Sequence, residues 1–160
     1  LALEHLKSSV RKADLERAVD LIASANAVYI VGLRRSFPVA SYLAYALRHV
    51  DKRAYLLDGV AGMLAEQSTM LTSKDLLIAI SFQPYAAETV EIVGSTREQK
   101  ARIIAITDSR LSPIAAASDL VFEIKDAEVR QFRSLTASLC LAQSLVISYA
   151  FDMEKRGRGR

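Results

Sequence analysis

The sequence predicts an α/β domain built around a parallel β-sheet. Short apolar runs rich in β-branched residues alternate with longer amphipathic segments, as strands alternate with helices in such a sheet. The runs lack alternating polar residues, which is typical of strands covered by helices on both faces. The 160 residues, 51% hydrophobic and 24% charged, suffice for one folded domain with its own core.

The first half of the chain is predicted to contain two strands. Asp14 is expected to cap an amphipathic helix over residues 15–25. The apolar run Ala27–Val31 is expected to be a strand that stops at Gly32, and Pro38 suits the N-terminus of the helix that follows. The next expected elements are a strand over Ala54–Leu57 and a helix from about Val60 to Met70.

The second half continues the alternation. The clearest strand pattern, Asp75–Ser81, leads through a polar turn into a helix expected from Ala86 to about Arg97. Strands are expected at Arg102–Thr107 and Leu120–Ile124, with a short alanine-rich helix between them and a long apolar helix at the end. Five parallel strands joined by right-handed crossovers favour a doubly wound, flavodoxin-like sheet of order 2-1-3-4-5 with helices on both faces.

Charge and cysteine content narrow the possible functions. Four of the 21 basic residues lie in the last six positions, 155–160, which are expected to form a disordered basic tail. The rest of the chain is nearly neutral and therefore a poor candidate for binding nucleic acid by itself. The single cysteine, Cys140, excludes a disulfide framework and a four-thiolate metal site, and it suits a reducing compartment such as the cytoplasm.

One stretch, Ser134–Phe151, contains no charged residue. A membrane span is the first alternative, but six polar side chains interrupt the stretch, and its length would only just cross a bilayer core of about 30 Å. Burial against the chain's own sheet and against another subunit explains an apolar helix of this kind better. We therefore expect no membrane segment and a homo-oligomer that uses this helix.

Two turns follow the first and third strands, at the position where ligands bind in doubly wound sheets. They are Gly32–Ser36 and Ser81–Tyr85, and each places a serine beside the start of a helix. Helix N-termini and free N–H groups favour an anion such as phosphate, and Arg34 and Arg35 could add charge-assisted hydrogen bonds. The alternative reading is that Ser36 and Ser81 are simply helix caps.

The catalytic and metal-binding inventory is sparse. His5 lies near the start of the chain, and His49 lies at the predicted end of a helix. Glu88 is placed in the first turn of a helix, where the dipole favours an acid in any case, and Asp58 and Asp108 lie near the expected pocket. These residues assemble no nucleophile, base and orienting group, and they predict no cofactor and no metal site.

At the two turns the sequence resembles the sugar isomerase (SIS) domain, and more narrowly the C-terminal effector domain of the MurR/RpiR family of bacterial transcriptional regulators. The resemblance covers VYIVGLRRSFPVASYLAYAL, LLIAISFQPYAAETVEIV, IIAITDSRLSPIAAASDLVFEI and the final helix. It implies an SIS domain over residues 14–154. It also implies that residues 1–13 are the remains of a helix linking this domain to an N-terminal helix-turn-helix domain, which would make the DNA contacts.

The resemblance further implies a phosphosugar, or another small anionic metabolite such as a sugar acid, bound by the two turns. The first family motif is G-x-G-x-S; Gly32 and Ser36 match it, and Arg34 replaces the second glycine. The second is I-S-x-S-G-x-T-x-E; Ile80, Ser81 and Glu88 match it. Its second serine, glycine and threonine are replaced by Gln83, Pro84 and Ala86, so hydroxyls and a flexible backbone position are lost. The expected ligand-binding residues are Gly32, Arg34, Arg35, Ser36, Ser81, Gln83, Tyr85 and Glu88.

Three functions fit these observations. The first is a non-enzymatic domain that senses a phosphosugar and dimerises within a transcriptional regulator. The second is a phosphosugar aldose–ketose isomerase, for which Glu88 is the only acid that the motif places near the sugar. The third is an oligomerisation domain that binds no ligand. We expect the first, because fold alone does not assign an activity and a catalytic base is not evident.

Overall fold

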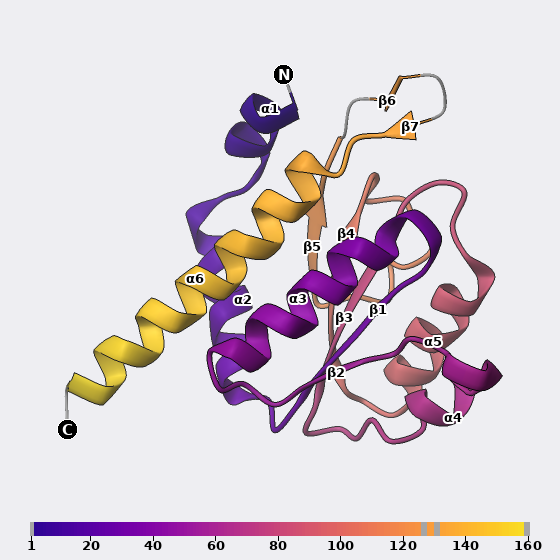
Figure 1. Ribbon diagram of the computed structural model, residues 1–160, viewed down its shortest axis with the longest axis horizontal. Helices are drawn as coiled ribbons and strands as arrows, with labels where there is room; N and C mark the ends of the chain where they lie inside the picture. The colour runs from indigo at the N-terminus through magenta and orange to yellow at the C-terminus, as the bar shows by residue number, and fades with distance from the viewer. Residues whose placement is uncertain (1, 126–127, 130–131, 159–160) are drawn as a thin grey trace.

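A computed structural model describes residues 2–125, 128–129 and 132–158 (Figure 1). At its centre lies a five-stranded parallel sheet of order β2-β1-β3-β4-β5. This order confirms the predicted fold class. The strands are β1 (Val28–Gly32), β2 (Ala54–Leu56), β3 (Leu76–Ser81), β4 (Arg102–Thr107) and β5 (Leu120–Glu123).

Helices cover both faces of the sheet because the central strands are apolar on both sides (Figure 1). One face carries α1 (Ala2–Ser9), α2 (Lys12–Ser24), α3 (Phe37–His49) and α6 (Thr136–Arg158), which share a core with alternate strand residues such as Ile30 and Ile78. On the other face lie α5 (Ala87–Glu98) and the short α4 (Leu64–Ser68), packed over Val31 and Leu77. Two 3₁₀ helices complete the set, η1 (Arg34–Ser36) and η2 (Val60–Gly62).

The structure corrects several local predictions. Helix α2 begins at Lys12 with Arg11 at its N-cap; Asp14 lies in the first turn and accepts hydrogen bonds from Arg11 at 3.0 and 3.1 Å. The predicted helix from about Val60 to Met70 is divided into η2 and α4, where Ala61 has a left-handed φ of 57°. The alanine-rich segment before β5 forms turns instead of a helix.

Two further differences lie at the C-terminal side of the fold. A hairpin of β6 (Glu128–Val129) and β7 (Phe132–Arg133) precedes α6 and was not predicted. The expected disordered tail is wrong for residues 155–158, because α6 continues through Arg158. An ion pair between Arg156 and Asp152, one helical turn earlier, has an N–O distance of 2.9 Å and supports this extension. Residues 159–160 lie outside the described residues.

Helix α6 contains most of the uncharged stretch Ser134–Phe151, and its packing explains why that stretch is apolar. Residues on one side of it, including Leu141 and Leu145, are buried in the core shared with α2 and α3. Ile147 and Phe151 stay 47% and 61% exposed. Within the described residues, no helix combines the length and apolar character needed to cross a membrane.

Candidate functional site

The two predicted turns meet in one small pocket at the carboxyl ends of β1 and β3. Its volume is about 50 Å³. Ser36 is the N-cap residue of α3 and Ala86 is the N-cap residue of α5, so both helix N-termini adjoin the same space. The lining residues are Leu33, Arg34, Arg35, Ser36, Ser81, Phe82, Pro84 and Ala86.

The first turn requires glycine at its start. A Cβ atom on Gly32 would lie 2.9 Å from the carbonyl oxygen of Ser36 and 3.0 Å from the Cβ atom of Ala40. Gly32 therefore lets the turn fold back tightly on itself, and it positions the site without lining the pocket. Arg34, which stands where the SIS motif has its second glycine, has a φ of 53°, in the left-handed region that glycine adopts without cost.

Neither serine hydroxyl caps the helix that follows its turn. Ser81 ends β3 and lies well before the N-cap of α5, so it does not cap that helix. Ser36 occupies the N-cap position of α3, but its side chain makes no capping hydrogen bond. Both residues are only 4% exposed, and within the described residues neither hydroxyl forms a hydrogen bond. Neither oxygen is among the fully buried polar atoms that lack a partner, so both stay accessible from the pocket.

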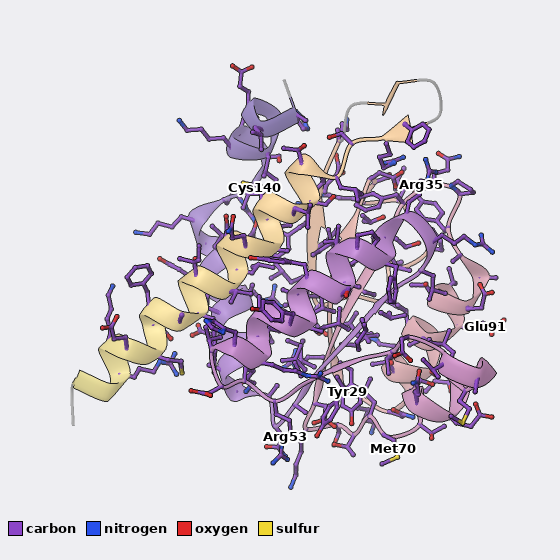
Figure 2. All side chains as sticks on the ribbon, viewed as in Figure 1. Tyr29, Arg35, Arg53, Met70, Glu91 and Cys140 are labelled. Atoms are coloured by element: carbon purple, nitrogen blue, oxygen red, sulfur yellow. The ribbon has the colours of Figure 1, made fainter. Side chains whose placement is uncertain are left out.

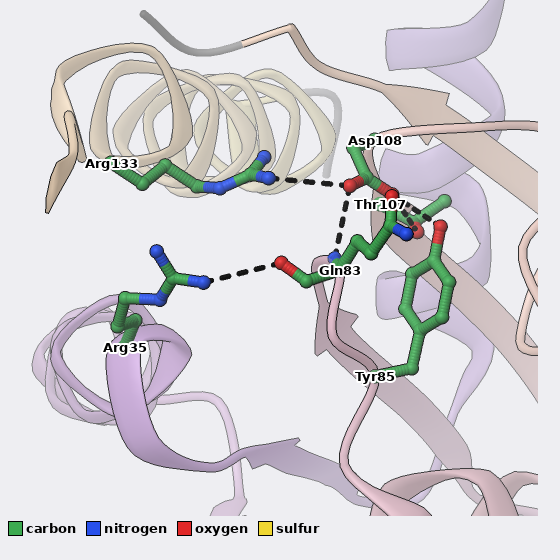
Figure 3. Close-up of polar contacts among 6 residues, drawn as sticks. All are labelled: Arg35, Gln83, Tyr85, Thr107, Asp108 and Arg133. Atoms are coloured by element: carbon green, nitrogen blue, oxygen red, sulfur yellow. Dashed lines mark hydrogen bonds and ion pairs between the residues drawn. The ribbon is translucent and has the colours of Figure 1, made fainter. Parts of the chain in front are cut away.

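The second turn is held in place by Asp108, the residue directly after β4 (Figure 3). The carboxylate accepts hydrogen bonds from the backbone N–H of Gln83 at 2.9 Å and from the hydroxyl of Tyr85 at 2.6 Å. From the first turn, Arg35 donates to the carbonyl oxygen of Gln83 at 3.2 Å. Gln83 and Tyr85 thus do not line the pocket as predicted; they tie the turn to Asp108 and Arg35.

These contacts change the acidity of both side chains. Burial raises the pKa of Asp108, but hydrogen bonds from Tyr85 and Gln83 and the positive charge of Arg133 outweigh it and lower the pKa below the usual 3.8. Burial, followed by the hydrogen bond to Asp108, raises the pKa of Tyr85 to about 12. At neutral pH Asp108 is therefore an ionised anchor and a weak base, while Tyr85 is a neutral donor.

Arg133, on β7, is the residue at this site that sequence reasoning missed entirely. Its guanidinium carbon lies 4.9 Å from the ring centroid of Phe82, which lines the pocket, and one of its terminal nitrogens lies 3.4 Å from Asp108. Asp108 could have been selected from its place at the carboxyl end of a central strand. Arg133 comes from a two-residue strand that carries no hydropathy signal.

The remaining candidates lie elsewhere. Glu88 is exposed in the first turn of α5 and does not line the pocket. His5 is exposed on α1, and His49 stacks on Tyr45 at the end of α3, with ring centroids 6.1 Å apart. Cys140 is half-buried on α6 (Figure 2). Among the described residues, no group of three or more histidine, cysteine, aspartate or glutamate side chains is arranged to hold a metal ion.

Comparison with known proteins identifies relatives among transcriptional regulators. The chain is 28% identical over 141 residues to an uncharacterized HTH-type transcriptional regulator, YbbH, of Bacillus subtilis, covering 86% of this chain and 48% of that protein. It is 27% identical over 125 residues to an uncharacterized protein of Archaeoglobus fulgidus, covering 76% and 65% of the two chains. The chain thus spans between about half and two thirds of the length of these curated relatives.

Solved structures share the fold. The sugar isomerase domain of an RpiR transcription factor from Sphaerobacter thermophilus superposes with a TM-score of 0.91 at 25% identity, covering 99% of this chain and 88% of that one. The NanR protein of Vibrio vulnificus, solved in complex with ManNAc-6P, gives a TM-score of 0.82 at 21% identity, with 96% and 60% covered. The family model of the SIS domain matches residues 21–148. This chain therefore belongs to the SIS domain family.

Proposed function

We propose that this chain is the effector-binding and dimerisation domain of an RpiR-type transcriptional regulator and that its effector is a phosphosugar. The observation that carries the proposal is that Ser36 and Ser81 line one pocket, where their hydroxyls form no hydrogen bond within the described residues. The likeness to the RpiR domain supports the regulatory role, and the NanR complex supports a phosphorylated sugar as the class of ligand.

The shape and electrostatics of the pocket suit a phosphate group. The pocket is small, with a volume of about 50 Å³, which is enough for a few water molecules or for a compact head group such as phosphate. The N-termini of α3 and α5 contribute backbone N–H groups and the positive ends of two helix dipoles. Arg34 and Arg35 line the pocket and add positive charge. The sugar would extend outward from the phosphate.

The regulatory part of the proposal assigns DNA binding to another part of a longer protein. Apart from the basic residues near the C-terminus, the chain is nearly neutral, so it lacks the charge excess of a nucleic-acid surface. Residues 1–13 include α1, which packs on α6, and they would connect the domain to an N-terminal helix-turn-helix unit. As part of a bacterial regulator, the domain would act in the cytoplasm.

Dimerisation is proposed through the exposed side of α6. Ile147 and Phe151 are exposed there. Phe151 borders a groove of about 630 Å³ between α2 and α6, which is also lined by the apolar residues Leu15 and Val19 and by the charged residues Lys12, Glu16, Asp20, Asp152 and Lys155. Such apolar exposure is typical of an interface. We expect a dimer by light scattering and a shift to monomer for Phe151→Asp, with Leu111→Asp as the control at another exposed apolar residue. A monomeric unmodified chain would contradict this arrangement.

An isomerase is the second candidate, favoured by one observation. Glu88 occupies the position of the acid in the SIS motif. It lies two residues after Ala86, the N-cap residue of α5, which lines the pocket. Solved structures described as a phosphoheptose isomerase and a putative sugar-phosphate isomerase share the fold at 17–20% identity. Against catalysis, Glu88 is exposed outside the pocket and Asp108 is held as an ionised anchor.

The two candidates are separated by one pair of assays. Binding of a panel of aldose and ketose phosphates, including ManNAc-6P, is measured by calorimetry, and interconversion of the same compounds is followed by NMR. The proposed function predicts that at least one phosphosugar binds and that none is converted. Turnover that disappears in Glu88→Gln would establish the isomerase instead, and absence of any binding would overturn both.

A further inference from the structure

Arg133 holds an unusual position at the edge of the pocket. Its side chain is only 10% exposed and lies over the ring of Phe82, which is itself 6% exposed and lines the pocket beside Ser36 and Ser81. Figure 3 shows Arg133 directed at Asp108 and Arg35 directed at the carbonyl oxygen of Gln83. Cationic side chains therefore reach the site from the first turn and from the hairpin.

The hydrogen-bonding capacity of Arg133 is largely unused. The guanidinium offers five N–H donors, but within the described residues its one hydrogen bond to a side chain is the 3.4 Å contact with Asp108. Its Nε atom is buried and has no hydrogen-bond partner in the same part of the chain. A charged group that is nine-tenths buried is favourable only when it is well paired, and Arg133 has one long ion pair with Asp108, so a further acceptor would stabilise it.

Asp108 does not supply that acceptor fully. Its two oxygens already accept shorter hydrogen bonds, at 2.6 Å from Tyr85 and 2.9 Å from Gln83. The contact with Arg133 is the longest of the three and involves a terminal nitrogen, which leaves Nε unpaired. Asp108 thus acts mainly as the anchor of the second turn, and the positive charge of Arg133 remains available to a ligand.

We propose that Arg133 binds a carboxylate of the ligand, so that the effector is a phosphorylated sugar acid. This inference rests on the proposed function, which places the phosphate between Ser36 and Ser81. A pentose or hexose chain attached to that phosphate extends out of the small pocket and past Phe82, where it meets the guanidinium of Arg133. Arginine recognises a carboxylate through two parallel N–H donors, whereas the hydroxyl or carbonyl of an uncharged sugar is a weaker acceptor.

The test compares matched ligands that differ at one carbon. Calorimetry on the full chain measures the affinity for glucose 6-phosphate against 6-phosphogluconate, and for ribose 5-phosphate against 5-phosphoribonate, with inorganic phosphate as a third probe. In the unmodified protein the acid binds roughly tenfold to a hundredfold more tightly than its aldose, since a hydrogen bond to a charged group contributes that much. Arg133→Gln abolishes this ratio, and Arg133→Lys, which keeps the charge, retains part of it.

Two control variants distinguish recognition of the carboxylate from a general effect. Ser81→Ala weakens both members of a pair equally, because it acts on their common phosphate. Arg102→Gln changes neither, because Arg102 pairs with Asp119 at the opposite end of the sheet. Equal affinity for acid and aldose in the unmodified protein overturns the inference while the proposed function stands, and so does a preference that survives in Arg133→Gln. Absence of binding by every probe overturns both.

Discussion

At the amino ends of the strands, Asp75 and Asp119 bond to backbone N–H groups of neighbouring strands, whereas at the carboxyl ends Ser36 and Ser81 lie buried without such partners. Asp75 accepts from Ala27 at 3.1 Å, and Asp119 accepts from Ile103 at 2.8 Å. The carboxylates at the amino ends are thus satisfied within the chain. The two ends of the sheet therefore differ in their polar side chains: those at the amino ends hold neighbouring segments together, and the two serines at the carboxyl ends line a pocket.

Carboxylates at the carboxyl ends also have formed hydrogen bonds, and Asp108 accepts from Gln83 and Tyr85. Asp108 holds the second turn in place through hydrogen bonds, as Asp75 holds the loop before β3. The carboxyl end therefore contains two kinds of polar residue: an anchor that fixes the loop, and the serines and Arg133, which we propose bind the ligand. Measurements of unfolding free energy can separate the anchor from these other residues.

The largest loss of stability is expected for Asp75→Ala. Asp75 is 8% exposed and accepts hydrogen bonds from the backbone N–H groups of Ala27 and Thr72 and from the Thr72 hydroxyl. Removing the carboxylate leaves buried donors unpaired, which costs about 3 kcal/mol of unfolding free energy. Urea denaturation measures this loss. The control Asp20→Ala removes an exposed ion pair with Arg156 and should change stability by less than about 0.5 kcal/mol. Equal effects of the two substitutions would refute the anchoring role.

A smaller loss, about 1–2 kcal/mol at pH 7, is expected for Asp108→Asn, because an amide cannot accept on both sides as the carboxylate does. The folded-state pKa of Asp108 lies below the usual 3.8. Its ionised form therefore stabilises the fold above that pH, and the contribution is lost as the pH falls further. The difference between the two proteins should shrink below pH 3.8. A difference that is the same at pH 3 and pH 7 would contradict the electrostatic part of this explanation.

The smallest effect is expected for Arg34→Gly. Arg34 has a φ of 53°, which costs a non-glycine residue about 1 kcal/mol, and glycine removes this cost while making the unfolded chain more flexible. We expect a net stabilisation of about 0.5 kcal/mol by thermal or urea denaturation. Arg34→Ala, which removes the side chain but keeps the strained backbone, should give none. Stabilisation of the same size in both variants would assign the gain to the lost charge.

Most of the fold could be predicted from the sequence because its central strands are covered on both faces. The apolar runs that include Leu76–Ser81 and Arg102–Thr107 have no polar face, so their burial is visible as hydropathy. The β6–β7 hairpin gave no such signal, since Phe132 is 82% exposed. The capping role predicted for Asp14 depended on a helix start that Arg11 occupies instead.

The site could be predicted only as far as topology determines it. Strand order alone places the turns Gly32–Ser36 and Ser81–Tyr85 side by side, and both contribute to the pocket. The orientations of Gln83 and Tyr85 depend on their hydrogen bonds to Asp108, which lies after the next strand. The motif within the second turn carries no information about that residue. Arg133 reaches the site through tertiary packing on Phe82, a contact that no local pattern encodes.

The most direct test measures whether the two serines bind an anion together. The affinity for inorganic phosphate is determined by calorimetry or by NMR chemical-shift titration for Ser36→Ala, Ser81→Ala and the control Ser112→Ala. Ser112 is also buried, at 2% exposed, and its hydroxyl lacks a partner in the described residues, but it lies outside the pocket. We expect Ser36→Ala and Ser81→Ala each to weaken binding by about tenfold or more while Ser112→Ala has no effect. Unchanged affinity in both pocket variants would place the anion elsewhere and contradict the assignment of the site.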